Sequence, residues 1–137
     1  MSTSIKEFES VSEFLKSIDD ALSEYRKRLG ELLRRLEELR VRSEQEKKLR
    51  AVLSKLGIPE TVATNEVALR NVRIVVNPTA VQELAAMEAA AEALNNKVTL
   101  LTAVRKELEI LSGIEVGAKL SVVYVDDVPR TIVLRLT

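Results

Sequence analysis

The chain has 137 residues, enough for one domain or for a small globular unit with a long helical extension. Its 21 Lys and Arg residues balance 21 Asp and Glu residues, so the net charge indicates no class of partner. The absence of Cys and His excludes disulfides, thiolate nucleophiles, and imidazole bases and metal ligands. No apolar run reaches the ~20 residues of a membrane-spanning helix, so we expect a cytoplasmic protein without a membrane contact. We also expect no cofactor. Sparse Gln beside abundant Glu, Arg and Lys is also typical of thermophilic proteins.

The first two-fifths of the chain carry a heptad pattern. Ser4 and Glu7 have the spacing of a capping box, which predicts a helix from Ile5. Apolar residues then recur in alternating steps of three and four, which is typical of a coiled coil. The positions are Phe8, Val11, Leu15, Ile18, Leu22, Tyr25, Leu29, Leu32, Leu36 and Leu39. Gly57, followed by Ile58 and Pro59, predicts the end of this helix at residue 56.

The charges along this helix predict how it associates. Residues 4–24 hold two basic and six acidic residues, whereas residues 25–57 hold eleven basic and five acidic residues. Two copies would therefore attract each other in the antiparallel orientation. We expect a homo-oligomer, a dimer or a tetramer, with the ten heptad positions as its interface. The alternative is that the stripe is one face of an intramolecular helical bundle.

The next segments alternate between strand and helix patterns. Residues 67–76 are rich in β-branched residues and predict a strand. Asn77 and Pro78 predict a helix cap and a first helical residue, and the helix is expected to run through residue 112 to Gly113. The alternative is two helices broken at Asn95–Asn96. The packing positions that we predict on this helix are Leu84, Met87, Leu94, Leu101 and Leu108.

The C-terminal residues predict a hairpin, with strands over 119–125 and 130–136 around a turn. The fold class expected from these elements is α+β: a long N-terminal coiled-coil helix followed by a small β-α-β-β unit, a three-stranded sheet with one long helix. The expected divisions are 1–57 for the long helix, 58–66 for a linker and 67–137 for the strand–helix–hairpin unit. Within that unit, the strand before the helix should pair in parallel through a right-handed crossover.

No residue set predicts catalysis, and we expect no catalytic residue and no metal ligand. Residues 124–127, Tyr-Val-Asp-Asp, resemble the Tyr-x-Asp-Asp hairpin of reverse-transcriptase-type polymerase palms, whose carboxylates hold divalent metals. The carboxylate that such a palm needs on an adjacent strand is replaced here by Asn77–Pro78. Asp-Asp is common in hairpin turns, so we interpret the motif as a turn.

The function class that the pattern favours is a non-enzymatic interaction protein, a coiled-coil assembly or adaptor component such as an accessory factor of cytoskeletal filaments or division machinery, with a protein partner. An alternative is a holdase chaperone, because the long helix, β segment and second long helix are similar to prefoldin, whose coiled-coil arms extend from a β platform. In prefoldin the strands lie between the helices, whereas two of three predicted strands here follow the second helix.

A second alternative is nucleic-acid binding through residues 26–50. Interleaved Glu residues and the lack of aromatic residues argue against it. The basic residues concerned are Arg26, Arg34, Arg35, Arg40, Arg42, Lys47 and Lys48.

Overall fold

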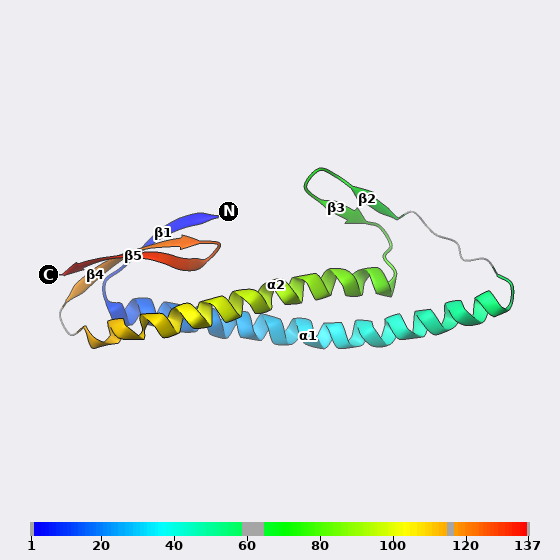
Figure 1. Ribbon diagram of the computed structural model, residues 1–137, viewed down its shortest axis with the longest axis horizontal. Coiled ribbons are helices and arrows are strands. Elements are labelled where there is room, and N and C mark those ends of the chain that lie inside the picture. Colours follow the sequence, from blue (N-terminus) through cyan, green and yellow to red (C-terminus); the bar gives the residue numbers. More distant parts are fainter. Residues whose placement is uncertain (1, 59–64, 115–116, 137) are drawn as a thin grey trace. The chain divides into compact units, whose positions relative to one another are not determined.

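The computed structural model describes residues 2–58, 65–114 and 117–136 (Figure 1). The elements are β1 (Thr3–Phe8), α1 (Val11–Lys55), β2 (Glu66–Ala68), β3 (Arg73–Val75), α2 (Ala80–Glu107), a 3-10 helix η1 (Leu108–Gly113), β4 (Ala118–Val125) and β5 (Val128–Leu136). This composition confirms the α+β class: a long N-terminal helix, a second helix and a three-stranded antiparallel sheet.

The chain divides into two units, which are described separately. The first comprises residues 1–29 and 93–137, and the second comprises residues 30–92. Each long helix contributes to both units, so this division cuts across the one expected at residue 57. Most of the expected linker, residues 59–64, lies outside the described residues.

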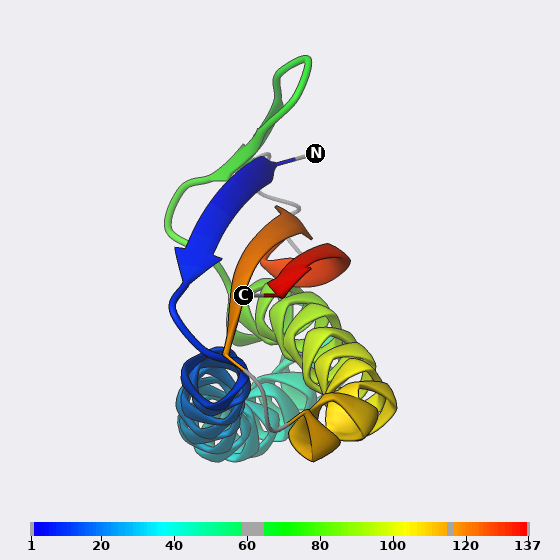
Figure 2. The ribbon, with the colours of Figure 1, turned by 90° about the vertical axis from the view of Figure 1, so that its left-hand side faces the viewer.

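The first unit is a sheet of order β1-β4-β5 on two helical segments (Figure 2). Alternate residues of the central strand β4 are buried because they face the helices, in the period-two pattern of a half-buried strand. Together with residues of α1 and α2 they form one core. Its fully or nearly fully buried members are Val11, Phe14, Leu15, Ile18, Leu22, Leu101, Ala118, Leu120, Val122, Tyr124 and Val128.

The N-terminal residues correct one expectation. Residues 3–8 form a strand, and Ile5 pairs with Val123 of β4. Phe8 therefore belongs to a strand and is no heptad position of the helix. The helix begins at Val11, where the Ser10 hydroxyl accepts a 3.0 Å hydrogen bond from the Glu13 backbone N–H. The capping box predicted at Ser4 is thus wrong, because Ser4 lies in β1. The same Ser-x-x-Glu spacing occurs six residues later, where the helix does begin.

The heptad stripe of α1 is covered within the chain along much of its length. In the first unit, Leu15, Ile18 and Leu22 are buried against α2 and the sheet. In the second unit, Leu36 and Leu39 are only 2% and 3% exposed. The stripe therefore behaves as the intramolecular alternative predicts, and its burial supplies no argument for a second copy.

The second unit contains a β-hairpin in place of the single strand expected over residues 67–76. Strands β2 and β3 pair antiparallel, with Val67 opposite Ile74. The backbone N–H of Leu69 donates a 2.7 Å hydrogen bond to the carbonyl of Val72, which closes the turn. The predicted parallel crossover is wrong, because these strands pair only with each other and the third strand of the main sheet is β1.

The helix ends follow local sequence signals. Gly57 has φ = 80°, and its N–H and that of Ile58 donate to the carbonyls of Ser54 and Leu53 at 3.1 and 3.0 Å, a Schellman motif. The predicted helix stop is confirmed.

The second helix runs through Asn95–Asn96 without a break, as predicted. Its cap, however, is Thr79 instead of Asn77. The Thr79 hydroxyl accepts from the Gln82 N–H at 3.1 Å, and the Gln82 side chain accepts from the Thr79 N–H at 3.0 Å. Asn77 has φ = 51°, which places it in the turn before the cap.

Candidate functional site

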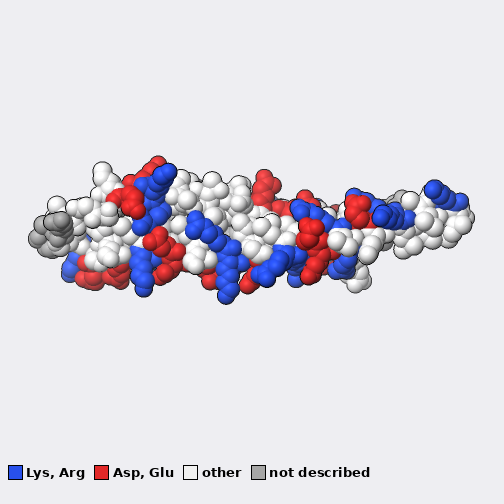
Figure 3. All heavy atoms as spheres, turned by 90° about the horizontal axis from the view of Figure 1, so that it is seen from below, with Lys and Arg blue, Asp and Glu red and all other residues white. Residues whose placement is uncertain are grey.

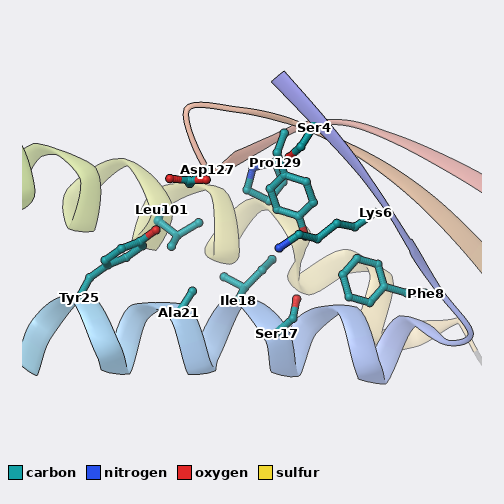
Figure 4. Close-up of a pocket in the computed structure, with 11 residues that line it drawn as sticks. Ser4, Lys6, Phe8, Ser17, Ile18, Ala21, Tyr25, Leu101, Asp127 and Pro129 are labelled. Atoms are coloured by element: carbon teal, nitrogen blue, oxygen red, sulfur yellow. The ribbon is translucent and has the colours of Figure 1, made fainter. Parts of the chain in front are cut away.

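A hollow of about 230 Å³ lies in the first unit between β1, α1, α2 and the β4–β5 turn (Figure 4). Its floor is apolar, with Ile18, Ala21 and Leu101, and its rim carries polar side chains of β1 and of the turn. The residues that line it are Ser4, Lys6, Phe8, Ser17, Ile18, Ala21, Tyr25, Leu101, Tyr124, Asp127 and Pro129. The volume is below the ~300–1,000 Å³ of typical small-molecule sites.

Two lysines lie over the two tyrosine rings of this hollow. The Lys6 ammonium is 5.2 Å from the centre of the Tyr124 ring, and the Lys97 ammonium is 5.3 Å from the centre of the Tyr25 ring. Lys97 also lies 3.5 Å from the carboxylate of Asp127. The first contact joins β1 to β4, the second joins α2 to α1, and the ion pair joins α2 to the β4–β5 turn. Each is of the kind that contributes about 1 kcal/mol or less near a surface.

Burial raises the pKa of the Tyr124 phenol above its ordinary value of 10, and hydrogen bonding with Ser17 partly opposes this rise. The phenol is therefore protonated at neutral pH and is neither a base nor an activated nucleophile there. Among the residues described around the hollow, the chemistry available is hydrogen bonding and weak cation binding. The arrangement is that of a seam between sheet and helices.

The Tyr-Val-Asp-Asp motif forms a hairpin turn, as predicted. Asp126 and Asp127 have φ = 51° and 66°, the left-handed values of a two-residue type I′ turn. The carboxylate of Asp126 accepts a 2.9 Å hydrogen bond from the backbone N–H of Ser2. Both carboxylates thus have contacts that hold β1 and α2 near the turn.

The second unit contains an apolar surface of a different kind. Directly opposite residues of an antiparallel pair share a face, and residues two apart along a strand return to it. Val67 and Ile74 are opposite each other, so their face continues through Leu69 on one strand and through Val72 and Val76 on the other. We call these five residues, Val67, Leu69, Val72, Ile74 and Val76, the apolar hairpin face; they are between 45% and 61% exposed.

The opposite side of the hairpin differs in character. Its strand residues are Glu66, Ala68, Arg73 and Val75. Val75 is half-buried, and the other three are exposed. The hairpin is fixed to the start of α2, because the side-chain amides of Asn65 and Gln82 form two reciprocal hydrogen bonds of 2.7 and 2.8 Å. The apolar hairpin face is therefore held in place while remaining in water.

Two polar residues in the sequence indicate this hairpin. Arg70 and Asn71 interrupt the aliphatic run of residues 67–76, and two polar residues between alternating apolar positions are typical of a hairpin turn.

The predicted basic residues do not form one face. In the second unit, helical geometry of about 100° per residue distributes Arg34, Arg35, Arg40, Arg42, Lys47 and Lys48 around the whole circumference of α1. Arg40 pairs with Glu37 at 3.4 Å and Lys47 with Glu44 at 3.6 Å. Figure 3 shows the same interleaving, with basic and acidic atoms mixed along the face drawn. No described feature favours a nucleic-acid backbone over a solvated helix.

The packing positions predicted on the second helix are placed as follows. Leu101 is fully buried in the first unit, and Leu94 and Leu108 of that unit are half-buried. Leu84 and Met87, in the second unit, are also half-buried. All five thus face packed or partly packed surroundings.

Comparison of the chain with protein-family models, with curated proteins and with solved structures gave no match. In the part of the chain that the structure describes, neither long helix has a stretch that is apolar enough over a bilayer's width to cross it. Residues 2–58, 65–114 and 117–136 contain no cluster of three or more carboxylate side chains that could hold a metal ion.

Proposed function

We propose that this protein is a non-enzymatic adaptor of the cytoplasm, a homo-oligomer that binds a partner protein through the apolar hairpin face. The observation that carries the proposal is that five aliphatic side chains, about half exposed, lie together on one side of a two-stranded hairpin. An isolated two-stranded hairpin is marginally stable in water, and an exposed apolar patch with polar surroundings is typical of a protein-interaction surface.

The chemistry of this face favours a protein partner over a small ligand or a nucleic acid. It offers aliphatic side chains on one side of a hairpin, with Arg70 and Arg73 as the nearby cations. Burying a Val or Leu side chain contributes ~1.5–3 kcal/mol when it is fully exposed beforehand. A partner that presents an apolar surface of similar size would gain roughly half of that for each of the five residues.

The experiment uses paired variants of the two sides of the hairpin. Val72→Thr/Ile74→Thr makes the apolar face polar but keeps β-branched residues in the strand, and Arg73→Thr is the control on the opposite side. A photo-crosslinking residue at position 72, with position 73 as its control, identifies the partner in the native cell. The purified partner should bind the wild type and Arg73→Thr equally, and the double variant at least about tenfold more weakly.

Equal binding of all three forms by the purified partner would contradict the proposal. So would a crosslink from position 72 that reaches only copies of this chain.

A second candidate is a holdase chaperone of the prefoldin type. The specific observation is that β2 and β3 lie between α1 and α2 in chain order, which is where prefoldin has its strands. The departure inferred from the sequence is therefore smaller than expected, although β1, β4 and β5 remain outside that arrangement. A holdase would suppress the aggregation of several unrelated denatured proteins, and Val72→Thr/Ile74→Thr would lose this activity. An adaptor would leave such aggregation unchanged.

A further inference from the structure

The outer side of α1 in the second unit carries an apolar stripe distinct from the heptad positions. At about 100° per residue, Val41, Leu49 and Val52 lie within about 40° of Gln45 around the helix. Leu56, the first residue after α1, continues this side, because its N–H still donates a 3.2 Å hydrogen bond to the carbonyl of Val52. The exposed fractions of these four aliphatic residues are 53%, 59%, 54% and 70%. We call these four residues with Gln45 the outer stripe.

The outer stripe points away from the packed side of the same helix. Leu36, Leu39 and Ser43, which are buried, lie about 120–180° around the helix from Gln45. The helix thus has two apolar sides in this unit, of which the chain itself covers one.

A hollow lies where the stripe begins. It measures about 380 Å³ and is lined by Glu37, Arg40, Val41, Glu44, Gln45 and Lys48. Residues 41, 44, 45 and 48 have the i, i+3, i+4, i+7 spacing of the hole that receives a side chain from a second helix in knobs-into-holes packing. The depression is open to solvent, so a side chain of a second helix can lie in it.

The charges beside the stripe select that helix. Glu37, Glu44, Lys48 and Lys55 all lie about 60–100° to one side of Gln45. Their order is acidic, acidic, basic, basic, so the flank reverses its charge near residue 46. Glu37 and Glu44 pair at present with Arg40 and Lys47 of their own helix, and such exposed pairs contribute little and exchange readily.

We infer that the outer stripe is an antiparallel interface between two copies of α1, centred between residues 46 and 47. In an antiparallel pair the same flank of both helices lies on the same side. Glu44 then faces Lys48 of the partner subunit, and Glu37 faces Lys55 of the partner subunit. In the stripe, Val41 lies across from Val52 of the partner subunit, and Gln45 lies across from Leu49 of the partner subunit. The inference deepens the proposed homo-oligomer and rests on that part of the proposed function.

Single cysteines test the orientation, because the chain has none of its own. Val41→Cys and Val52→Cys are oxidised separately and as an equal mixture. The antiparallel interface gives a disulfide dimer only in the mixture. Positions 41 and 52 are about 16 Å apart along a helix, so a parallel interface would crosslink each variant alone and would overturn the inference.

Charge exchange tests the flank. Lys48→Glu should weaken self-association by about tenfold, because it repels Glu44 of the partner subunit at two symmetric positions. The double exchange Glu44→Lys/Lys48→Glu should restore it. Lys106→Glu, at an exposed position of α2, is the matched control and should leave self-association within about twofold of the wild type. A double exchange no better than Lys48→Glu would contradict the proposed pairing.

The mass in solution separates the possible failures. A mass above the 15.3 kDa of one chain, without a crosslink between positions 41 and 52, would overturn the stripe and leave the oligomer standing. A mass of one chain at all concentrations would overturn the oligomer and the stripe together. Neither result changes the binding test of the apolar hairpin face, which decides the adaptor part of the proposal.

Discussion

Gly30 inside α1 and Gly57 just after its end occupy opposite backbone situations. Gly57 has φ = 80°, a left-handed conformation that an L side chain adopts only at a cost. Gly30 lies inside the helix, and a Cβ added there would meet nothing within 4 Å. The same substitution should therefore have opposite effects at the two positions.

Gly57→Ala should lower the free energy of unfolding by about 1 kcal/mol, because it strains the Schellman motif. Gly30→Ala should raise the free energy of unfolding by about 0.5–1 kcal/mol, because alanine has less backbone entropy to lose in a helix. Urea unfolding followed by circular dichroism measures both. If both variants shift the midpoint in the same direction, one of these backbone assignments is incorrect.

The two tyrosines of the chain permit a direct test of burial at Tyr124. Tyr25→Phe leaves Tyr124 as the only phenol. Absorbance at high pH should show it ionising above pH 10, because burial raises its pKa. Titration at pH 10 or below in the folded variant would contradict the burial.

The same shift has a consequence for stability. The folded state holds the phenolic proton more tightly than the unfolded chain does, so the free energy of unfolding should fall as the pH rises through about 10. Tyr124→Phe should remove that part of the decline.

At the scale of elements, the sequence predicts those parts that local signals define. Gly57 ends α1, the unbroken periodicity carries α2 through Asn95–Asn96, and Asp126–Asp127 form a turn between two alternating strands. These signals act within a few residues, so one sequence suffices to find them.

The elements that the sequence pattern does not predict depend on distant partners. Strand β1 is a strand because its residues pair with β4 more than a hundred positions away, and Asp126 donates its N–H to the carbonyl of Ser2 at 2.7 Å. Phe8 happens to fit the heptad spacing, which extended the predicted helix too far. The candidate surface on β2–β3 does not follow from the predicted single strand, because one strand over residues 67–76 puts its aliphatic residues on both faces of a larger sheet, whereas the hairpin puts five of them on one face.

The start of α1 distinguishes the two capping interpretations experimentally. Ser10→Ala should lower the free energy of unfolding by about 1 kcal/mol, since the Ser10 hydroxyl satisfies the N–H of Glu13. Ser4→Ala should change it by less than about 0.5 kcal/mol, because Ser4 is an exposed residue of β1. Denaturant unfolding of the two single variants measures this difference. A larger loss for Ser4→Ala would place the cap where the sequence first suggested it.

In the whole molecule, one side of α1 stabilises the fold and another side is exposed and available for association. The heptad positions stabilise the fold, since Leu22 is 4% exposed in the core with Leu101 and the sheet. The outer stripe and the apolar hairpin face are exposed and contribute little to the folded chain alone. Stability and association should therefore respond to different substitutions.

Leu22→Ala tests this separation. It removes a buried side chain from the first unit and should lower the free energy of unfolding by about 2–5 kcal/mol. The association constant of the folded variant should stay within about twofold of the wild type, because Leu22 does not lie on the outer stripe. Val52→Ser should do the reverse: it should weaken association at least about fivefold and change the free energy of unfolding at low concentration by less than about 0.5 kcal/mol. Sedimentation equilibrium and urea unfolding of the same samples give both quantities. If folded Leu22→Ala no longer associates, the heptad positions form the interface between copies and the outer stripe does not. Leu22 would then be needed for assembly because it contacts the second copy.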